Sequence, residues 1–283
     1  MERILKKEFD YAKLTTRKIT MPPDECPVAL TIAGSDSGGG AGIQADLLTF
    51  SAHGVFGTTA ITCLTAQNPD GVTAIEVLPA PFVAEQIQQV HRYYQVRALK
   101  TGMLFSAEII GIVAHFLATH RKIPAVIDPV MVATSGARLL KSRAIAALGE
   151  KLLPQAALVT PNLDEAGALL GVRPTTLPEM TEAGCRLAAR YGVPFLVKGG
   201  HLRGPGLSDV LVTPDGTVRT YGWQRREGVD THGSGCTLSA AIAANLAKGL
   251  ALRHAVEAAR LYLFHGLERS LAVGDRRFIN HRP

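Results

Sequence analysis

The chain has 283 residues, of which 47% are hydrophobic and 19% charged, and its formal net charge is +6. This length fits one doubly wound α/β domain, and the hydrophobic share is ample for a large core. Residues 1–20 and 260–283 each carry a net charge of +3, so that the body between them is neutral. A nucleic-acid-binding face needs clustered positive charge on the fold, so we expect no nucleic-acid partner and two solvated basic ends.

The sequence shows no sign of a membrane-spanning helix, a zinc site or a cysteine redox motif. No apolar run approaches the ~18 residues that a membrane-spanning helix needs, and residues 1–20 lack the apolar core of a secretory signal. We therefore expect a cytoplasmic protein with no membrane partner. The four cysteines show no Cys-x-x-Cys spacing, which gives no indication of a zinc site or a redox motif.

Short apolar runs alternate with amphipathic stretches along the chain. The runs predict buried strands at residues 28–33, 58–64, 98–101, 125–128, 157–160 and 195–198. The amphipathic stretches predict helices at residues 41–53, 81–94 and 106–120, and from residue 235 to about residue 270. Residues 209–213 and 217–221 flank Pro214-Asp215-Gly216, which is a hairpin signal.

Strands that are continuously apolar and alternate with helices predict a mostly parallel sheet covered on both faces. The hairpin adds a small antiparallel edge to this three-layer α/β/α arrangement. We expect a single domain over residues 28–270, preceded by an extension at residues 1–27 and followed by a tail at residues 271–283.

Polar or glycine-rich residues follow almost every predicted strand, which is where such sheets bind ligands. The strongest signal is Thr231-His232-Gly233-Ser234-Gly235-Cys236-Thr237, which precedes a helix of small residues. Glycines let several backbone amides approach an anion, and the start of the helix adds its positive end. The segment therefore indicates a phosphate site, although a plain glycine-rich turn would look similar.

A second glycine-rich loop, at residues 34–42, also leads from a strand to a helix. It does not match the dinucleotide-binding fingerprint, because Ile43 stands where the third glycine is required. The chain contains no Gly-Lys-Ser/Thr, so a P-loop is excluded as well. Asp46, on the helix behind this loop, could equally face a ligand or water.

Asp128, Asn162 and Glu165 follow neighbouring strands and offer the oxygen ligands that suit Mg²⁺. Asn162 could instead be a helix N-cap, and Glu165 could be a first-turn acid that favours the helix dipole. Lys198 ends a strongly apolar strand, which favours a buried lysine that neutralises phosphate over a surface lysine.

Seven segments lead to a family resemblance, and they occur in the family's order. They are residues 33–37, 39–46, 65–68, 128–131, 160–162, 198–201 and 231–241. With these segments the chain resembles the hydroxymethylpyrimidine and phosphomethylpyrimidine kinases of thiamine biosynthesis, in the ribokinase-like superfamily. The resemblance spans about residues 28–270.

The resemblance implies ATP, Mg²⁺ and two successive phosphorylations, first of the hydroxymethyl oxygen of a 4-amino-2-methylpyrimidine and then of the resulting monophosphate. It also implies roles for particular residues. Gly34, Asp46 and Gln67 would line the pyrimidine pocket, with Met103 and Val130 as apolar walls. Gly233, Ser234 and Gly235 would hold the transferring phosphoryl group; Lys198, Asn162 and Thr231 would bind the nucleotide phosphates; Asp128 and Glu165 would bind magnesium.

Cys236 stands where many ribokinase-like enzymes place a catalytic aspartate. Its position near a helix start should lower the pKa of the thiol, so that a thiolate could accept the proton of the alcohol. The alternative is that Cys236 only shapes the pocket and water accepts the proton.

The chain departs from the family pattern in three places. Gly38 stands where serine or proline-serine is common, and Ser234 replaces threonine. Residues 274–281 replace the family's glycine-histidine-rich ending, so no role is transferred there. Two other functions stay open, a pyridoxal or pyridoxine kinase of the same superfamily and a nucleotide-binding sensor without turnover. We expect the assembly to be a homodimer.

Overall fold

The computed structural model describes residues 25–131, 142–200, 202, 206–226 and 228–283. In this part of the chain nine strands form one sheet, in the order β3-β2-β1-β4-β5-β6-β7-β8-β9. The strands are β1 Val28–Asp36, β2 Phe56–Asn68, β3 Gly71–Val77, β4 Val96–Thr101, β5 Ala125–Ile127, β6 Leu158–Val159, β7 Phe195–Val197, β8 Gly206–Val212 and β9 Val218–Gln224. The predicted extension at residues 1–27 lies largely outside the described residues.

The middle of the sheet is parallel and its two edges are antiparallel. Strands β1, β2, β4, β5, β6 and β7 pair in parallel, whereas β8 and β9 pair antiparallel at one edge. This confirms the mostly parallel sheet and the hairpin around Pro214-Asp215-Gly216. The structure adds an antiparallel edge that the sequence pattern did not indicate, because β2 runs on to Asn68 and turns back into β3.

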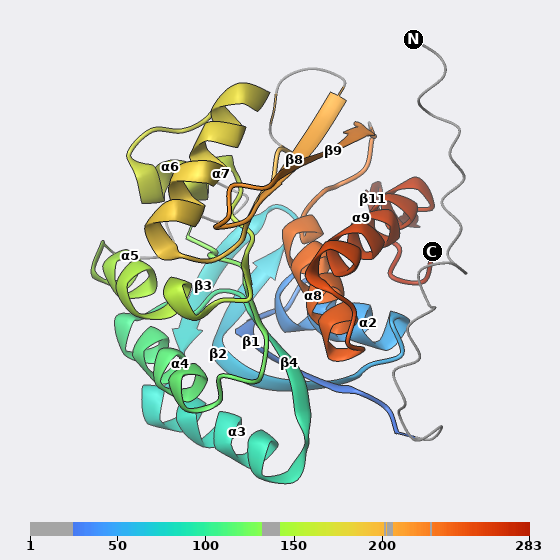
Figure 1. Ribbon diagram of the computed structural model, residues 1–283. Helices are drawn as coiled ribbons and strands as arrows, with labels where there is room; N and C mark the ends of the chain where they lie inside the picture. Colours follow the sequence, from blue (N-terminus) through green and yellow to red (C-terminus); the bar gives the residue numbers. More distant parts are fainter. Residues whose placement is uncertain (1–24, 132–141, 201, 203–205, 227) are drawn as a thin grey trace.

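Helices cover both faces of the sheet, which confirms the three layers (Figure 1). One hydrophobic core lies between the sheet and α3, α4, α6 and α7, and a second lies between the sheet and α2, α8 and α9. The helices are α2 Gly42–Ala52, α3 Ala80–Tyr93, α4 Ala107–Thr119, α5 Ser142–Ala147, α6 Leu163–Leu170, α7 Leu177–Tyr191, α8 Ser234–Ala247 and α9 Leu252–Glu268. Short π and 3₁₀ turns follow α5 at Leu148–Leu152 and Leu153–Gln155.

Helix α8 holds a central position because its side chains are small. Residues 240–244 of this helix are Ala-Ala-Ile-Ala-Ala, and all of them are fully buried. Small side chains let α8 pack closely against the sheet and between α2 and α9. The first turn of α8 therefore lies at the carboxyl edge of the parallel strands.

The C-terminal segment at residues 271–283 packs against the domain through part of its length, although many of its side chains, including Leu271 and Val273, are exposed. Strands β10 Leu271–Val273 and β11 Arg276–Phe278 form a hairpin, and Ile279 is buried in the core beside α9. The N–H of Asn280 donates to the carbonyl oxygen of Gly266 at 2.9 Å. The apolar Ile279 after the last helix contacts the core, and the net charge of the segment could not indicate this contact.

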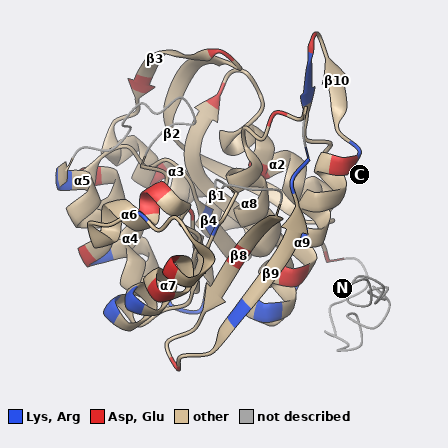
Figure 2. Cartoon of the chain, turned by 90° about the horizontal axis from the view of Figure 1, so that it is seen from above, with Lys and Arg blue, Asp and Glu red and all other residues tan. Residues whose placement is uncertain are grey.

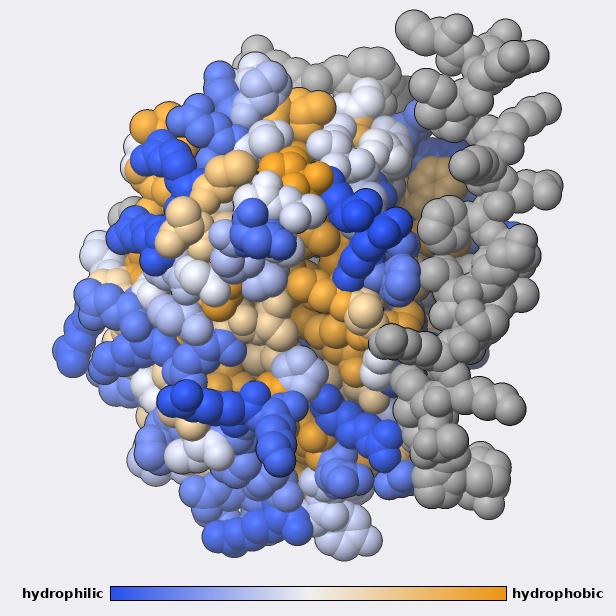
Figure 3. Space-filling model, viewed as in Figure 1, coloured by the Kyte–Doolittle hydropathy of each residue, from blue (hydrophilic) through white to orange (hydrophobic). Residues whose placement is uncertain are grey.

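The surface carries charges of both signs. Figure 2 shows Lys and Arg interspersed with Asp and Glu around the periphery of the fold. On the face seen in Figure 1, hydrophobic side chains reach the surface in the middle of the molecule and hydrophilic ones surround them (Figure 3). Among the described residues, no helix has the length and apolar character needed to cross a membrane.

Candidate active site

A cavity of about 750 Å³ opens at the carboxyl edge of the sheet. Its lining comes from the ends of β1, β2 and β4, from the segments after β5, β6 and β7, and from the loop before α8. The cavity brings together all but one of the residues predicted from the sequence. Those on its lining are Gly34, Gln67, Met103, Asp128, Val130, Asn162, Glu165, Lys198, Thr231, Gly233, Ser234, Gly235 and Cys236.

A buried ion pair marks one end of the cavity. Lys198 Nζ lies 2.7 Å from Asp128 Oδ1, and the two side chains are 12% and 2% exposed. Burial acts to lower the pKa of Lys198, but the nearby acidic groups, Asp128 foremost, together outweigh it and hold the pKa above its ordinary value. Lys198 is thus a permanent cation at the end of β7, next to the position that the sequence predicted for phosphate.

The first turn of α8 faces this ion pair. A Cβ atom at Gly235 would lie 3.0 Å from Lys198 Nζ, which shows how closely the two approach. Gly233 has a left-handed φ of 79°, and a Cβ there would lie 1.8 Å from the carbonyl oxygen of Gly40. Only glycine fits at residue 233, because the two glycine-rich loops pack directly against each other at that point.

The environment of Cys236 differs from the expectation. The residue lies in the first turn of α8, but burial raises the pKa of its thiol to about 11, and the nearby ammonium of Lys100 offsets this only in part. The predicted lowering of the pKa is therefore wrong for the protein without ligands. Loss of water around the sulfur outweighs the helix start.

Asp46 is the predicted residue that does not line the cavity. Its side chain is fully buried, and its Oδ2 accepts hydrogen bonds from Lys100 Nζ at 2.8 Å and from Thr31 Oγ1 at 2.6 Å. Burial raises the pKa of Asp46 and acts to lower that of Lys100, but Asp46 and the other nearby acidic groups together hold the pKa of Lys100 above the ordinary value. Asp46 thus anchors Lys100, which does line the cavity.

Asn162 and Glu165 are joined in a capping box at the start of α6. The N–H of Glu165 donates to Asn162 Oδ1 at 2.9 Å, and the N–H of Asn162 donates to Glu165 Oε2 at 2.8 Å. Burial raises the pKa of Glu165 to about 8. Both residues therefore act as helix caps, and both also line the cavity.

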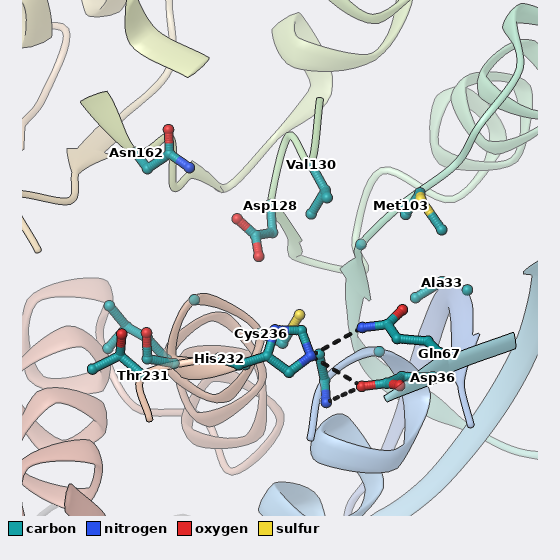
Figure 4. Close-up of a pocket in the computed structure, with 18 of the residues that line it drawn as sticks. Ala33, Asp36, Gln67, Met103, Asp128, Val130, Asn162, Thr231, His232 and Cys236 are labelled. Carbon is teal, nitrogen blue, oxygen red and sulfur yellow. Dashed lines mark hydrogen bonds and ion pairs between the residues drawn. The ribbon is translucent and has the colours of Figure 1, made fainter. Parts of the chain in front are cut away.

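The other end of the cavity carries an amide and apolar walls (Figure 4). Met103 and Val130 point into the cavity from one side, opposite Gln67. A Cβ atom at Gly34 would lie 2.8 Å from Cys63 Sγ and 2.9 Å from Met103 Cε. Because Gly34 has no side chain, Cys63 and Met103 can pack against its backbone. A side-chain amide opposite two apolar side chains suits a flat ring that carries polar groups at its edge.

A histidine joins the two glycine-rich loops at this end. His232 Nε2 lies 3.1 Å from Asp36 Oδ2 and 3.1 Å from Gln67 Nε2. Burial alone would raise the pKa of Asp36, but His232 and the backbone N–H groups of Gly38 and Ala41 hold it below the ordinary value. The ionised Asp36 thus holds its own loop and His232 together.

Sequence reasoning missed Asp36, His232 and Lys100. The first two lie inside motifs that were quoted for the resemblance, so their positions at strand and loop ends could have marked them as candidates. Lys100 follows the apolar Ala98 and Leu99 in a strand that is expected to be buried. A buried lysine needs a partner, and that need is the signal that could have linked it to Asp46.

Comparison with known proteins agrees with this geometry. Residues 36–280 match the family model described as phosphomethylpyrimidine kinase. The chain is 48% identical over 256 residues to the hydroxymethylpyrimidine/phosphomethylpyrimidine kinase of Rhizobium meliloti, which covers 88% of this chain and 94% of that protein. It is 44% identical to the protein of that name from Haemophilus influenzae, over 87% of this chain and 93% of that one.

Solved structures give the same result. A phosphomethylpyrimidine kinase from Clostridium difficile 630 is 40% identical with a TM-score of 0.74, over 84% of this chain and 98% of that chain. An ADP complex of pyridoxal kinase from Bacillus subtilis is 34% identical with a TM-score of 0.83, over 91% and 98%. The chain therefore belongs to the phosphomethylpyrimidine kinase family, whose members are phosphotransferases with the ribokinase-like fold.

Proposed function

We propose that this protein transfers the γ-phosphoryl group of ATP to the hydroxymethyl oxygen of 4-amino-5-hydroxymethyl-2-methylpyrimidine, and then to the resulting monophosphate. The observation that carries the proposal is that one cavity joins a ring-binding end with a phosphate-binding end. Gln67, Met103 and Val130 stand at the first, and Lys198 and the α8 start at the second. The names of the relatives support the same reaction in thiamine biosynthesis.

In this proposal Gln67 selects the pyrimidine. A side-chain amide offers both a donor and an acceptor, which matches the amino group and ring nitrogen of an aminopyrimidine. Met103 and Val130 contact the faces of the ring, and Gly34 lets Met103 lie close to the backbone of β1. Asp46, which does not line the cavity, acts on the site through Lys100.

The phosphoryl end supplies charge where the transfer needs it. As the alcohol oxygen forms its bond to the γ-phosphorus, the bond to the leaving oxygen of ADP breaks and negative charge spreads over the phosphoryl oxygens. Amides of Gly233, Ser234 and Gly235 and the ammonium of Lys198 stabilise that charge. Thr231 and Asn162 line the cavity and would bind the nucleotide phosphates. Cys236 loses its own proton to water and then, as a thiolate, accepts the proton of the alcohol; in the alternative, water accepts that proton directly.

Magnesium fits Asp128 better than Glu165. Mg²⁺ is usually held by one or two carboxylates together with substrate phosphates, and Asp128 is a carboxylate beside the phosphate end. Glu165 is committed to the α6 capping box. We therefore assign Asp128 to the magnesium of Mg·ATP, where the ion would neutralise phosphate charge, and we assign Glu165 to holding the backbone.

Pyridoxal is the second candidate substrate, because pyridoxal kinases from two bacteria overlay on the chain with TM-scores of 0.83 and 0.82. The decisive experiment offers Mg·ATP with hydroxymethylpyrimidine, its monophosphate and pyridoxal, separately and in competition, and identifies products by mass spectrometry. The proposal predicts the pyrimidine monophosphate followed by the diphosphate. Phosphorylation of pyridoxal alone would contradict the substrate assignment, and phosphorylation of neither ring would favour a sensor.

Three features of the protein remain expectations. The single kinase domain expected at residues 28–270 stays a proposal, which we extend to include the C-terminal hairpin. We also propose a homodimeric assembly and a cytoplasmic location. Light scattering after gel filtration measures the assembly directly, and a monomeric mass would contradict the dimer.

A further inference from the structure

The C-terminal hairpin places an arginine outside the rim of the cavity. Arg276, on β11, donates from Nη1 to the carbonyl oxygen of Pro69 at 3.0 Å and from Nη2 to Asp70 Oδ1 at 2.5 Å. Its Nη1 also lies 3.8 Å from Asp230 Oδ2. The guanidinium therefore contacts both the turn between β2 and β3 and the loop that leads to α8. Both of those segments line the cavity, whereas Arg276 itself does not.

The same two segments also meet inside the cavity. Gln67 stands near the end of β2, and its amide lies 3.1 Å from His232 in the loop before α8. Asp230 connects the inner and outer contacts, because its Oδ1 accepts the N–H of His232 at 2.8 Å while its Oδ2 faces Arg276. Its own N–H donates to the carbonyl oxygen of Arg277 at 2.8 Å, which fixes the hairpin to the loop.

We propose that Arg276 is a positioning residue for the ring-binding end of the cavity. It holds the β2–β3 turn against the loop before α8, so that Gln67 and His232 stay in register with each other. The substrate in this proposal is taken from the proposed function, whereas the contacts of Arg276 do not depend on that function. It also gives a role to residues 274–281, where the chain departs from the usual ending of its family.

The chemistry of arginine suits this role better than that of lysine. A planar guanidinium can bind a carbonyl oxygen and two carboxylates in fixed directions, whereas an ammonium acts as a point charge on a flexible stem. Arg276 and Asp70 are 38% and 78% exposed, so solvent screens their attraction and the effect of losing it is modest. Its removal also leaves Asp70 and Asp230 without the cation that contacts both.

The test compares Arg276→Ala and Arg276→Lys with the unaltered protein and with Arg253→Ala. The control removes an exposed arginine that is paired with Glu257 on α9, away from the cavity. Arg276→Ala should raise KM for the pyrimidine alcohol about two- to fivefold, with kcat and KM for ATP nearly unchanged. Arg276→Lys should fall in between, and Arg253→Ala should match the unaltered protein.

A second measurement does not depend on the substrate. Amide hydrogen exchange at residues 66–74 of the free protein should become faster in Arg276→Ala and stay unchanged in Arg253→Ala, because the turn loses an outer support. Asp70→Asn should produce the same acceleration. Combining it with Arg276→Ala should add little, because the two side chains form one contact.

The outcomes separate the two proposals. Unchanged exchange and unchanged KM in Arg276→Ala would overturn the positioning role, and so would equal losses for the pyrimidine and for ATP. If the unaltered protein phosphorylates no pyrimidine, the proposed function fails, and the exchange measurement still decides whether Arg276 holds the turn.

Discussion

The two ends of the cavity are built in different ways. At the phosphoryl end, Lys198 and Asp128 are nearly buried, and they lie at the ends of parallel strands beside the first turn of α8. At the ring-binding end, Gln67 and Asp36 stand at the ends of β2 and β1, His232 stands in the loop before α8, and Arg276 supports them from an exposed hairpin.

This difference separates transfer from recognition. Charges that are buried and paired before substrate arrives need little rearrangement when charge develops, so they contribute mainly to the transition state. A side chain such as Gln67 that contacts the ring away from the transferred group contributes mainly to the affinity for the ring. Substitutions at the phosphoryl end should therefore lower kcat, and substitutions at the ring-binding end should raise KM for the pyrimidine.

The largest effect is expected from removing the cation at the phosphoryl end. Lys198→Met should lower kcat by about 10²–10³-fold, because charge stabilisation in the transition state is lost. Lys151→Met, which alters an exposed lysine, should have no effect. Circular dichroism melting distinguishes this loss from unfolding, since the change leaves Asp128 buried without its partner. A folded Lys198→Met protein with normal kcat would contradict the assignment of transition-state stabilisation to the phosphoryl end.

Cys236 should show the next largest effect, together with a pH signature. If its thiol accepts the proton, Cys236→Ala should lower kcat by about 10²-fold, and Cys236→Asp should recover part of the rate. The free protein's thiol has a pKa of about 11, so it is neutral at pH 7 and its ionised fraction grows as the pH rises. The rate should therefore rise with pH between 7 and 9, by up to about tenfold per unit.

The pH profile and a second cysteine provide the controls for Cys236. The slope should disappear in Cys236→Ala and persist in Cys185→Ala, because Cys185 is exposed on α7. If Cys236→Ala keeps most of its turnover, the thiol is not the base and water accepts the proton.

At the ring-binding end, Gln67→Leu should weaken pyrimidine binding by ~1–3 kcal/mol, because polar atoms of the ring lose their partner in a closed pocket. The affinity for ATP should barely change. Gln95→Leu alters an exposed glutamine outside the cavity and should leave both affinities intact. Equal losses of affinity for both ligands in Gln67→Leu would show that Gln67 has a structural role and does not recognise the ring.

The sequence predicted the phosphoryl end better than the ring-binding end. Apolar runs located the parallel strands, and the residues after each strand meet at one edge by the geometry of such sheets, so Asp128 and Lys198 could be placed together. The sequence indicated helix capping by Asn162 and Glu165 only as an alternative to ligand binding. The roles of Gln67, Met103 and Val130 came from the family resemblance and not from their spacing.

Other features could not be predicted because they depend on long-range packing. The pKa of Cys236 is governed by burial that a local helix-start rule does not include. Asp46 turns inward because Lys100, 54 residues further along the chain, is its partner. Arg276 and Asp70 are 206 residues apart in sequence, and a charge count assigned the first to a solvated tail.

One pair of titrations tests the division between the two ends most directly. Calorimetry with the pyrimidine alcohol is carried out on Lys198→Met and on Gln67→Leu, each compared with the unaltered protein. The structure predicts a Kd close to normal for Lys198→Met and a Kd raised by about one order of magnitude or more for Gln67→Leu. A Kd that rises equally in both variants would contradict the separation of recognition from transfer.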